Sequence, residues 1–397
     1  MHNLDLAQAR PERAAATPWV DALHAKLDRW MTHPRMYRWA LSNPLSRWFA
    51  VRRTRQLFDL MSGFVYSQVL LSCVRLNLFA IVQKAPATLE ELAARTQLPL
   101  AALQRLVLSA VSLKLLEPRS GQRYGLGALG APLAVHEGIR AMVEHNSLLY
   151  RDMTEPTDFL RDAWSGHMAA YWPYAHARTP EQVKAADAVD VARYSALMAA
   201  SQTFVLEQVL SAFPFADYRC VLDVGCGKGR FIAELAARQP QLQFQLFDLP
   251  QVLGLARQNH ASLGVQASIA YHPGSFFHDE LPTGADLVTL IRVAHDHPDE
   301  GVRTILRKIF QALPVGGTLM LAEPMAHERG SDQSTDAYFH FYLLAMGAGR
   351  LRTPSELAQM LRDCGFVHVE LVPNSMPIHT RILIARKPGA ANAISPK

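Results

Sequence analysis

The chain has 397 residues, of which 49% are hydrophobic and only 19% are charged. Folded domains average ~25% charged residues, so this composition excludes an intrinsically disordered chain. The 22 glycines and 24 prolines follow no regular period, which excludes a collagen-like repeat. At ~150 residues per domain, the length predicts two or three domains with a large core.

The four cysteines form neither a disulfide framework nor a C-x-x-C metal pattern, so we expect a reducing compartment and no metal site. They are Cys73, Cys220, Cys226 and Cys364. The first 20 residues lack the apolar core of a secretory signal, and no uninterrupted run of ~18 apolar residues occurs. These features predict a cytoplasmic protein that is neither exported nor membrane-spanning.

The net charge of +5 comes from the N-terminal arm. Residues 1–56 hold ten Lys and Arg against four Asp and Glu, which leaves 30 against 31 for the rest of the chain. The arm also holds four of the six tryptophans, Trp19, Trp30, Trp39 and Trp48. Arg interleaved with Trp is typical of a helix in a lipid headgroup layer. An arm that packs across a partner subunit fits equally well, and both interpretations stay open.

Two helices are predicted after the arm. Apolar residues recur at helical spacing over 57–79, which predicts a mostly buried helix. Thr88 and Glu91 have the spacing of a capping box, in which the Thr hydroxyl and the Glu carboxylate each accept a backbone N–H bond, so a short helix is expected over 89–96.

A further helix is predicted over 100–114, followed by a Gly-rich hairpin over 119–124. Together with the helix over 89–96 they have the layout of a helix-turn-helix with a wing. Such a layout in a basic protein raises the possibility of a DNA-binding regulator. The helix over 100–114 is apolar on nearly every face, however, which suits burial between subunits better than contact with base edges. We therefore expect no nucleic-acid partner.

Residues 136–205 are predicted to form helical connections, with a helix over 189–210. From Cys220 onward, short β-branched runs alternate with helical patterns, which predicts a mostly parallel sheet covered on both faces and an α/β class. The expected strands are 221–224, 244–247, 286–291, 318–322, 367–372 and 381–385.

The first of these strands leads directly into a glycine-rich loop, 223–229, of the form D-x-G-x-G-x-G. Glycines allow a sharp turn and let a ligand approach the backbone amides, so a nucleotide-type cofactor is expected. The dinucleotide fingerprint would need glycine where this chain has Arg230. Asp248 ends the second strand, 23 residues after Gly225, where a carboxylate can accept both ribose hydroxyls. Asp223 is expected either to cap the following helix or to pair with a cationic amino group.

This loop, with an acid after the second strand, resembles that of the class I S-adenosylmethionine (SAM)-dependent methyltransferases. Further motifs resemble the dimeric small-molecule O-methyltransferases: Gly274-Ser-Phe-Phe277, Ile291-Arg-Val-Ala-His-Asp296, Leu313-Pro-Val-Gly-Gly317 and Leu321-Ala-Glu-Pro324. Within that group, three segments are similar to the bacterial O-methyltransferases of acyclic carotenoids: Phe64-Val-Tyr-Ser-Gln-Val-Leu-Leu71, Tyr150-Arg-Asp-Met153 and Tyr171-Trp-Pro-Tyr174.

The resemblance implies a Rossmann-like class I methyltransferase domain with an N-terminal all-helical winged-helix dimerisation domain. The expected segments are a basic Trp-rich arm (1–56), the winged-helix dimerisation domain (57–135), a helical connection that contributes to the substrate pocket (136–205), the SAM-binding domain (206–388) and a disordered tail (389–397).

The resemblance also implies roles for individual residues. His295 stands at the position of the catalytic base, and Glu323 at that of an acid that holds the other nitrogen of this histidine. A second such acid, present in the plant enzymes, is replaced here by Leu351. Met198, Tyr342 and Met346 fall at positions that line the acceptor.

The cofactor positions implied by the resemblance follow the same order along the chain. Gly225 and Gly227 would hold the methionine end, together with Asp223, while Asp248 and Leu249 would hold the ribose. The remaining positions are Ser275, Phe276 and Phe277 around the adenine and Arg292 near the cofactor carboxylate. Ser275 replaces the Asp that most relatives have, which puts the contact with the adenine amino group in doubt.

Together, these features predict a homodimeric SAM-dependent O-methyltransferase that modifies the tertiary C-1 hydroxyl of acyclic carotenoids of the demethylspheroidene or hydroxyneurosporene type. We expect it in the cytoplasm, with a peripheral contact to the inner, photosynthetic membrane through the arm as an open question. The alternatives are another lipophilic acceptor, such as a bacteriochlorophyllide ring carbon or a polyketide phenol, and a ligand-sensing DNA-binding protein.

Overall fold

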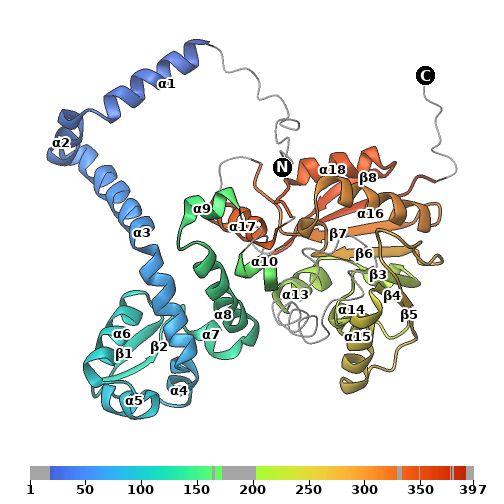
Figure 1. Ribbon diagram of the computed structural model, residues 1–397, viewed down its shortest axis with the longest axis horizontal. Helices are drawn as coiled ribbons and strands as arrows, with labels where there is room; N and C mark the ends of the chain where they lie inside the picture. Colours follow the sequence, from blue (N-terminus) through green and yellow to red (C-terminus); the bar gives the residue numbers. More distant parts are fainter. Residues whose placement is uncertain are drawn as a thin grey trace. The chain divides into compact units, whose positions relative to one another are not determined.

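The computed structural model describes residues 18–162, 166–171, 203–328, 333–347, 349–375, 377 and 380–389 (Figure 1). The chain forms two compact units, Met1–Ser72 and Cys73–Lys397, which are described separately below.

The first unit consists of three helices, α1 (Pro18–Met31), α2 (Pro34–Ser42) and most of α3 (Pro44–Arg75). Proline fits the first turn of a helix because its missing N–H would have no intrahelical partner there. The ring nitrogen of His33 accepts a bond from the Arg35 amide at 3.2 Å, which caps α2.

Helix α3 corrects the prediction of a mostly buried helix. It begins well before residue 57, and Phe58, Met61 and Phe64 are 54%, 65% and 72% exposed. Helical periodicity reveals an apolar surface but not which chain covers it, and the described part of this chain leaves these side chains exposed. An 18-residue window of α3 has a mean hydropathy of 1.5 and is 17% buried, so α3 has the length and composition to cross a membrane, although the sequence analysis found no such run.

The second unit begins with the predicted helix-turn-helix and its wing. The elements are α4 (Leu78–Lys84), α5 (Leu89–Thr96), α6 (Leu100–Ser112), the hairpin β1 (Leu116–Arg119) and β2 (Arg123–Leu126), and α7 (Ala131–Val135). The predicted capping box is confirmed, because the Thr88 hydroxyl accepts the Glu91 amide and the Glu91 carboxylate accepts the Thr88 amide. Leu103, Val107 and Ala110 anchor α6 in the core.

A helical connection follows, made of α8 (Glu137–Asp152), α9 (Pro156–Arg161), α10 (His167–Tyr171) and α13 (Thr203–Ala212). The predicted helix over 189–210 lies mostly outside the described residues, and α13 covers its last part. Asp152 joins α8 to α10, since its carboxylate accepts bonds from the His167 and Met168 amides at 2.7 and 2.8 Å.

The remainder forms a seven-stranded sheet in the order β5-β4-β3-β6-β7-β9-β8. Its strands are β3 (Cys220–Val224), β4 (Gln243–Asp248), β5 (Ile269–Pro273), β6 (Leu287–Ile291), β7 (Thr318–Glu323), β8 (Val367–Val372) and β9 (Arg381–Arg386). The first five in sheet order pair in parallel, and β9 pairs antiparallel with both β7 and β8, so β9 alone runs in the opposite direction. The six predicted strands and the mostly parallel arrangement are confirmed. Strand β5 was missed, because its sequence mixes polar and apolar residues.

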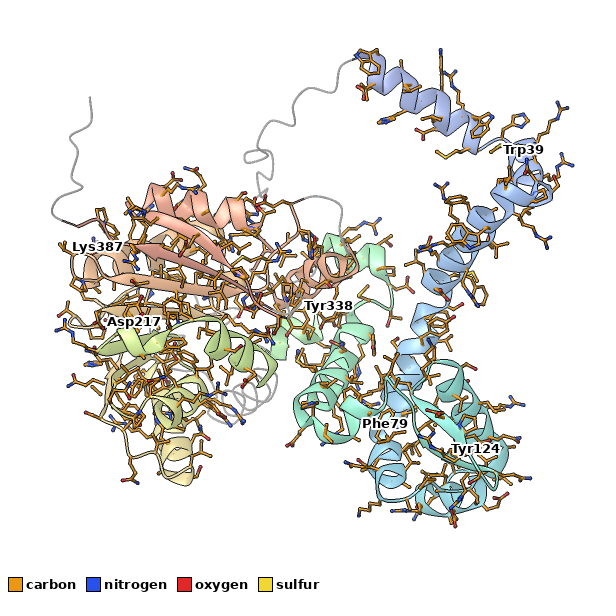
Figure 2. The ribbon with its side chains drawn as sticks, turned by 180° about the vertical axis from the view of Figure 1, so that it is seen from behind. Trp39, Phe79, Tyr124, Asp217, Tyr338 and Lys387 are labelled. Carbon is orange, nitrogen blue, oxygen red and sulfur yellow. The ribbon has the colours of Figure 1, made fainter. Side chains whose placement is uncertain are left out.

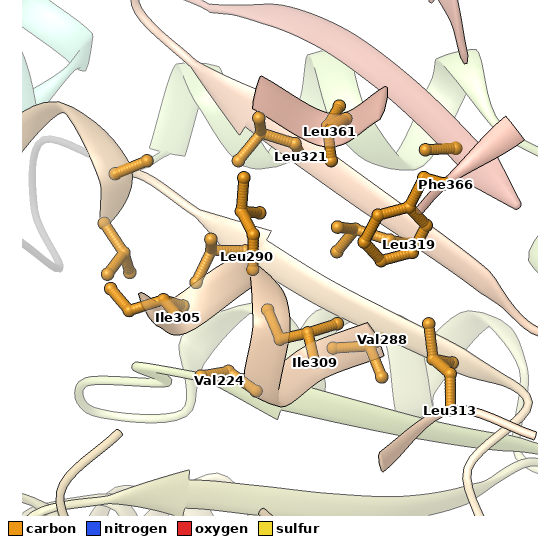
Figure 3. Packing of buried hydrophobic residues seen from close by; sticks show 14 of the residues in the cluster. Val224, Val288, Leu290, Ile305, Ile309, Leu313, Leu319, Leu321, Leu361 and Phe366 are labelled. Carbon is orange, nitrogen blue, oxygen red and sulfur yellow. The ribbon is translucent and has the colours of Figure 1, made fainter. Parts of the chain in front are cut away.

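Helices cover both faces of this sheet (Figure 1). They are α14 (Arg230–Arg238) and α15 (Pro250–Ser262) on one face, and α16 (Asp299–Ala312) and α18 (Pro354–Asp363) on the other. Figure 3 shows Ile305 and Ile309 of α16 packed beside Val288 and Leu290 of β6 in one continuous cluster. This packing fixes the carboxyl ends of β3, β4, β6 and β7 along one edge, where ligands bind in open α/β sheets.

Candidate active site

The glycine loop at the end of β3 has a backbone that only glycine adopts readily. Gly225, Gly227 and Gly229 have φ values of 71°, 54° and 67°. A Cβ on Gly225 would lie 2.7 Å from a methyl of Val293, so the loop packs tightly against the chain that follows β6. A Cβ on Gly227 would have no atom within 4 Å, so this part of the loop faces free space.

Asp248 joins the end of β4 to this loop. Its Oδ2 accepts the Gly227 amide at 2.8 Å, and its Oδ1 accepts the Leu249 amide at 2.7 Å. Burial raises the Asp248 pKa to about 6, against the lowering effect of those two bonds. Each carboxylate oxygen keeps a second acceptor site, which suits the vicinal hydroxyls of a ribose.

Asp223 is buried in the sheet beside this loop. The Thr289 hydroxyl donates to its Oδ1 at 2.7 Å. The Asp223 pKa is raised to about 7, mainly by burial. The Thr289 bond opposes this shift, and the nearby Asp248 contributes to it. The capping interpretation is wrong, because the N-cap of α14 is Gly229 and no side chain caps that helix.

The loop after β5 is held by its own side chains. The Ser275 amide donates to the Asp279 carboxylate at 2.8 Å, and the Ser275 hydroxyl accepts the Phe277 amide at 3.3 Å. Phe276 and Phe277 pack edge-to-face on each other and on the ring of His297. Two of the three predicted adenine residues, Phe276 and Phe277, therefore contact the same side chain, that of His297, which lies two positions after His295.

His295 lies in a single 3-10 turn, η3 (Ala294–Asp296), which follows β6. Its ring is buried, and its Nδ1 lies 2.5 Å from Oε2 of Glu323, the last residue of β7. Glu323 Oε1 also accepts the amides of Val293 and Ala294 at 2.9 and 2.7 Å. The structure thus brings together the two residues predicted to form the catalytic pair, and one buried carboxylate organises both the imidazole and the turn that carries it.

The second nitrogen of this imidazole faces another carboxylate, Asp296, which the sequence analysis did not single out. His295 Nε2 lies 3.3 Å from Asp296 Oδ1. Burial raises the Asp296 pKa, while His295 and Arg292 lower it and Glu323 raises it. Its position directly after the histidine was the available signal.

Arg292 directly follows β6 and has a φ of 55°, in the left-handed region that a residue with a side chain rarely adopts. Its amide donates to the Ala322 carbonyl at 2.8 Å, which keeps the strand paired up to the turn. Its charge lowers the pKa of both Asp296 and Tyr338, so Arg292 lies near these two side chains.

Arg352 also holds the turn that carries His295. This guanidinium is only 2% exposed and donates to the Ala294 carbonyl at 2.9 Å and the His297 carbonyl at 2.7 Å. It also pairs with Asp299, which begins α16. Gly349 lets the same loop approach closely, because a Cβ there would lie 2.1 Å from the His295 carbonyl oxygen.

The acceptor side is mostly apolar. Tyr342 and Met346 on α17 (Gln333–Met346) belong to one buried cluster with Leu351, the residue that replaces the second acid. Tyr342 Oη lies 3.3 Å from Nε2 of His145 on α8, and the Tyr342 ring stacks on Tyr338. Burial lowers the pKa of His145 to about 4. The other buried members are Leu149, Phe159, Met168, Ala326, Leu343 and Ala345.

The sequence analysis missed two residues that join α17 to α8 beside this cluster. Tyr338, labelled in Figure 2, donates to Asn146 of α8 at 3.0 Å. They belong to segments almost 200 residues apart, so no local pattern could have paired them. Met198, by contrast, was predicted to contact the acceptor but lies outside the described residues.

Comparison with known proteins agrees with this geometry. Residues 150–367 match the O-methyltransferase domain, and residues 58–135 match the O-methyltransferase dimerisation domain. The chain belongs to the O-methyltransferase family. It is 36% identical over 348 residues to demethylspheroidene O-methyltransferase of Cereibacter sphaeroides, covering 88% of this chain and 91% of that one.

Other relatives agree. Demethylspheroidene O-methyltransferase of Rhodobacter capsulatus is 39% identical, with 87% of this chain and 85% of the relative covered. Human N-acetylserotonin methyltransferase, solved in complex with SAM, superimposes with a TM-score of 0.71 at 25% identity and covers 85% of this chain and 98% of the human one. This chain is thus a SAM-dependent O-methyltransferase with a class I fold and an N-terminal dimerisation domain that supports a homodimer.

The residues at the carboxyl edge fit the cofactor. Free space beside Gly227 accommodates a ligand against the backbone, and the Asp248 carboxylate retains acceptor capacity for ribose hydroxyls. The Asp223 carboxyl, whose pKa is about 7, suits a neighbouring amino group that would favour its charged form.

Proposed function

We propose that this enzyme methylates the tertiary C-1 hydroxyl of acyclic carotenoids of the demethylspheroidene or hydroxyneurosporene type, as a step of carotenoid biosynthesis. The observation that carries the proposal is the buried His295–Glu323 pair beside the apolar cluster that contains Leu351. The names of the two bacterial relatives support the same substrate class. A hydrocarbon chain fits an apolar lining, and its single hydroxyl fits one imidazole.

In this proposal, His295 removes the proton of the hydroxyl. Glu323 accepts a bond from Nδ1 and so keeps the Nδ1–H tautomer, which leaves the lone pair of Nε2 for the acceptor. An aliphatic alcohol has a pKa near that of water, ~15.7, and imidazole has one of ~6.5, so His295 cannot ionise the alcohol in advance. The proton must leave as the new bond forms, and alignment must supply most of the rate.

Asp296 would stabilise His295 once its Nε2 has taken the proton of the hydroxyl. When Nε2 becomes protonated, its N–H can donate to Asp296 Oδ1, which lies 3.3 Å away. The imidazolium would then lie between two carboxylates, since Glu323 holds Nδ1. Such a pair of charges stabilises the cationic ring in a buried site.

The cofactor supplies an electrophilic methyl group on a sulfonium. We propose that Gly225, Gly227 and Asp223 hold its methionine end, with Arg292 near the carboxylate. Asp248 and Leu249 would hold the ribose, and Ser275, Phe276 and Phe277 would line the adenine. On the acceptor side we propose Tyr342, Met346 and Met198.

We also propose that the enzyme works on the cytoplasmic side of the membrane in which such carotenoids dissolve, as a peripheral protein. A nucleic-acid partner is not part of this proposal. Helix α6 buries Leu103 and Val107 in its own domain, and its outer face carries Leu108, which is 50% exposed and is not a side chain that reads base edges.

Three acceptors tested with radiolabelled SAM and the purified protein decide the substrate class. They are an acyclic carotenoid with a C-1 hydroxyl, the same carotenoid without it, and a small phenol, each dispersed in detergent. The expected result is label in the first only. Label in the phenol, or in a carbon of a bacteriochlorophyllide added as a fourth acceptor, would overturn the proposed substrate.

A further inference from the structure

The N-terminal unit carries a surface that the described part of the chain leaves uncovered. We call it the arm surface and define it as the exposed apolar side chains of α1, α2 and the first two turns of α3. They are Trp19, Leu23, Leu27, Trp30, Met31, Trp39, Leu41, Leu45, Trp48, Phe49 and Val51, all at least 36% exposed. Trp39 on α2 is labelled in Figure 2.

In α1 these side chains form a stripe. Trp19, Leu23, Leu27 and Trp30 recur at intervals of four, four and three residues. At ~100° per residue they occupy less than a third of the helix circumference. Asp21 lies away from this stripe, so α1 has the apolar face of a helix that lies in a membrane interface.

The charge of the arm complements an anionic surface. Between residues 34 and 57 there are six arginines and no Asp or Glu. Within the described part of the chain, none of these arginines forms an ion pair, and the Arg52 guanidinium lies 5.5 Å from the centre of the Trp48 ring. Trp beside Arg is the combination that suits the headgroup layer of a bilayer.

A groove adds room for an alkyl chain. It has a volume of about 380 Å³ and is lined by Leu41 of α2 and by Val51, Thr54, Arg55 and Phe58 of α3. Its lining is apolar except for Thr54 and Arg55, whose side chains suit a polar headgroup. The groove therefore continues the arm surface with the same combination of apolar and cationic groups.

A second copy of this chain is a weaker match for the arm surface. The rest of the chain carries 30 Lys and Arg against 31 Asp and Glu, so it offers no acidic excess to six unpaired arginines. The part of the chain that matches the dimerisation domain begins at residue 58, after the arm surface.

From these observations we infer that the arm surface binds the face of a bilayer that contains anionic phospholipid. This deepens the peripheral location in the proposed function, on which it rests for the choice of a lipid partner. The arm would hold the enzyme where its substrate is dissolved, while the methyl transfer itself would not require the arm.

The test is sedimentation of the full-length dimer with phosphatidylcholine vesicles, with and without phosphatidylglycerol. We expect binding only with the anionic lipid, and weaker binding at high salt. Arg52→Ala/Arg53→Ala/Arg55→Ala should weaken binding roughly a hundredfold, because each cation near such a surface contributes about fivefold. A matched control, Arg95→Ala/Arg105→Ala/Arg362→Ala, removes three exposed arginines elsewhere and should leave binding unchanged.

A second variant, Trp30→Ala/Trp39→Ala/Trp48→Ala, removes the aromatic contribution and should weaken binding to the anionic vesicles at low and at high salt alike. All variants should keep full activity on carotenoid dispersed in detergent, which separates failure of this inference from failure of the proposed function. No binding to anionic vesicles, or equal binding of the arginine variant, overturns the inference. Conversion of the dimer to monomer by the arm variants would also overturn it and assign the surface to a second copy.

Discussion

Replacing Glu323 with Gln tests the centre of the proposed site with a change of one atom. The carboxylate accepts the amides of Val293 and Ala294 through Oε1, and the Nδ1 and amide of His295 through Oε2. In Glu323→Gln the carbonyl oxygen can keep the first two bonds. The new NH₂ group would then face two donors, and the imidazole can avoid this only by moving its proton to Nε2.

Both stability and rate follow from those four contacts. A hydrogen bond to a charged group contributes ~1.5–3 kcal/mol, so losing two should lower the free energy of unfolding by about 3–6 kcal/mol. A proton on Nε2 removes the lone pair that takes the substrate proton. General-base catalysis contributes ~10²–10⁴-fold, and kcat should fall by that factor while the dissociation constant of SAM changes little.

The measurements are kcat on a dispersed carotenoid, SAM affinity by calorimetry, urea unfolding, and ¹⁵N NMR of the imidazole nitrogens assigned with His295→Ala. Glu300→Gln is the matched control, because it makes the same chemical change at a side chain 74% exposed. The double variant His295→Ala/Glu323→Gln should be no slower than His295→Ala, since the two residues act as one unit. Retention of kcat within threefold, despite lost stability, would refute the assigned role of the carboxylate.

Three further outcomes are expected. Gly225→Ala should abolish SAM binding in a protein that still folds, as seen by calorimetry and circular dichroism, because a Cβ would lie 2.7 Å from Val293 at a φ of 71°. Arg352→Met should lower kcat at least tenfold with little change in KM, because the Ala294 and His297 carbonyls lose the guanidinium that donates to them. Arg352→Lys should recover part of the lost rate. Burial raises the Asp223 pKa to about 7, so the folded enzyme without ligand holds a proton that the unfolded chain loses near pH 4. Its stability should therefore fall from about pH 4 to 7 while SAM affinity rises through pH 7. Asp223→Asn should make both changes smaller and leave the contribution of Asp248, whose pKa burial raises to about 6.

The sheet could be predicted because its strands are short β-branched runs separated by helical patterns. The exception, β5, contains Tyr271 and His272 among its five residues, and its role as an edge strand tolerates this mixture. The exposure of α3 could not be predicted from its sequence, because Phe58 and Phe64 have the same periodicity whether a helix of the same chain or another subunit covers them.

The candidate site also contains contacts that the sequence predicts and contacts that it does not. Gly225, Gly227 and Asp248 follow consecutive parallel strands, so their meeting at one edge is a consequence of topology. The contact between Glu323 and His295 came from the resemblance to a known family, because nothing local relates residues 28 positions apart. The sequence analysis assigned no role to Arg352, because its bonds to the Ala294 and His297 carbonyls join residues more than 50 positions apart.

The loss of the second acid is consistent with an aliphatic alcohol as acceptor. Glu323 already satisfies three backbone amides and the imidazole, and a carboxylate at position 351 would add a like charge to a buried site, which raises the pKa of one partner. A stronger base has little value when the proton must leave together with methyl transfer, because no imidazole ionises an alcohol of pKa ~15.7 in advance. Alignment of the hydroxyl then limits the rate, and an apolar wall that fixes the hydrocarbon chain improves alignment. Leu351 extends such a wall, since it is buried with Tyr342 and Met346, so the same substitution removes an unneeded charge and adds a contact for the substrate.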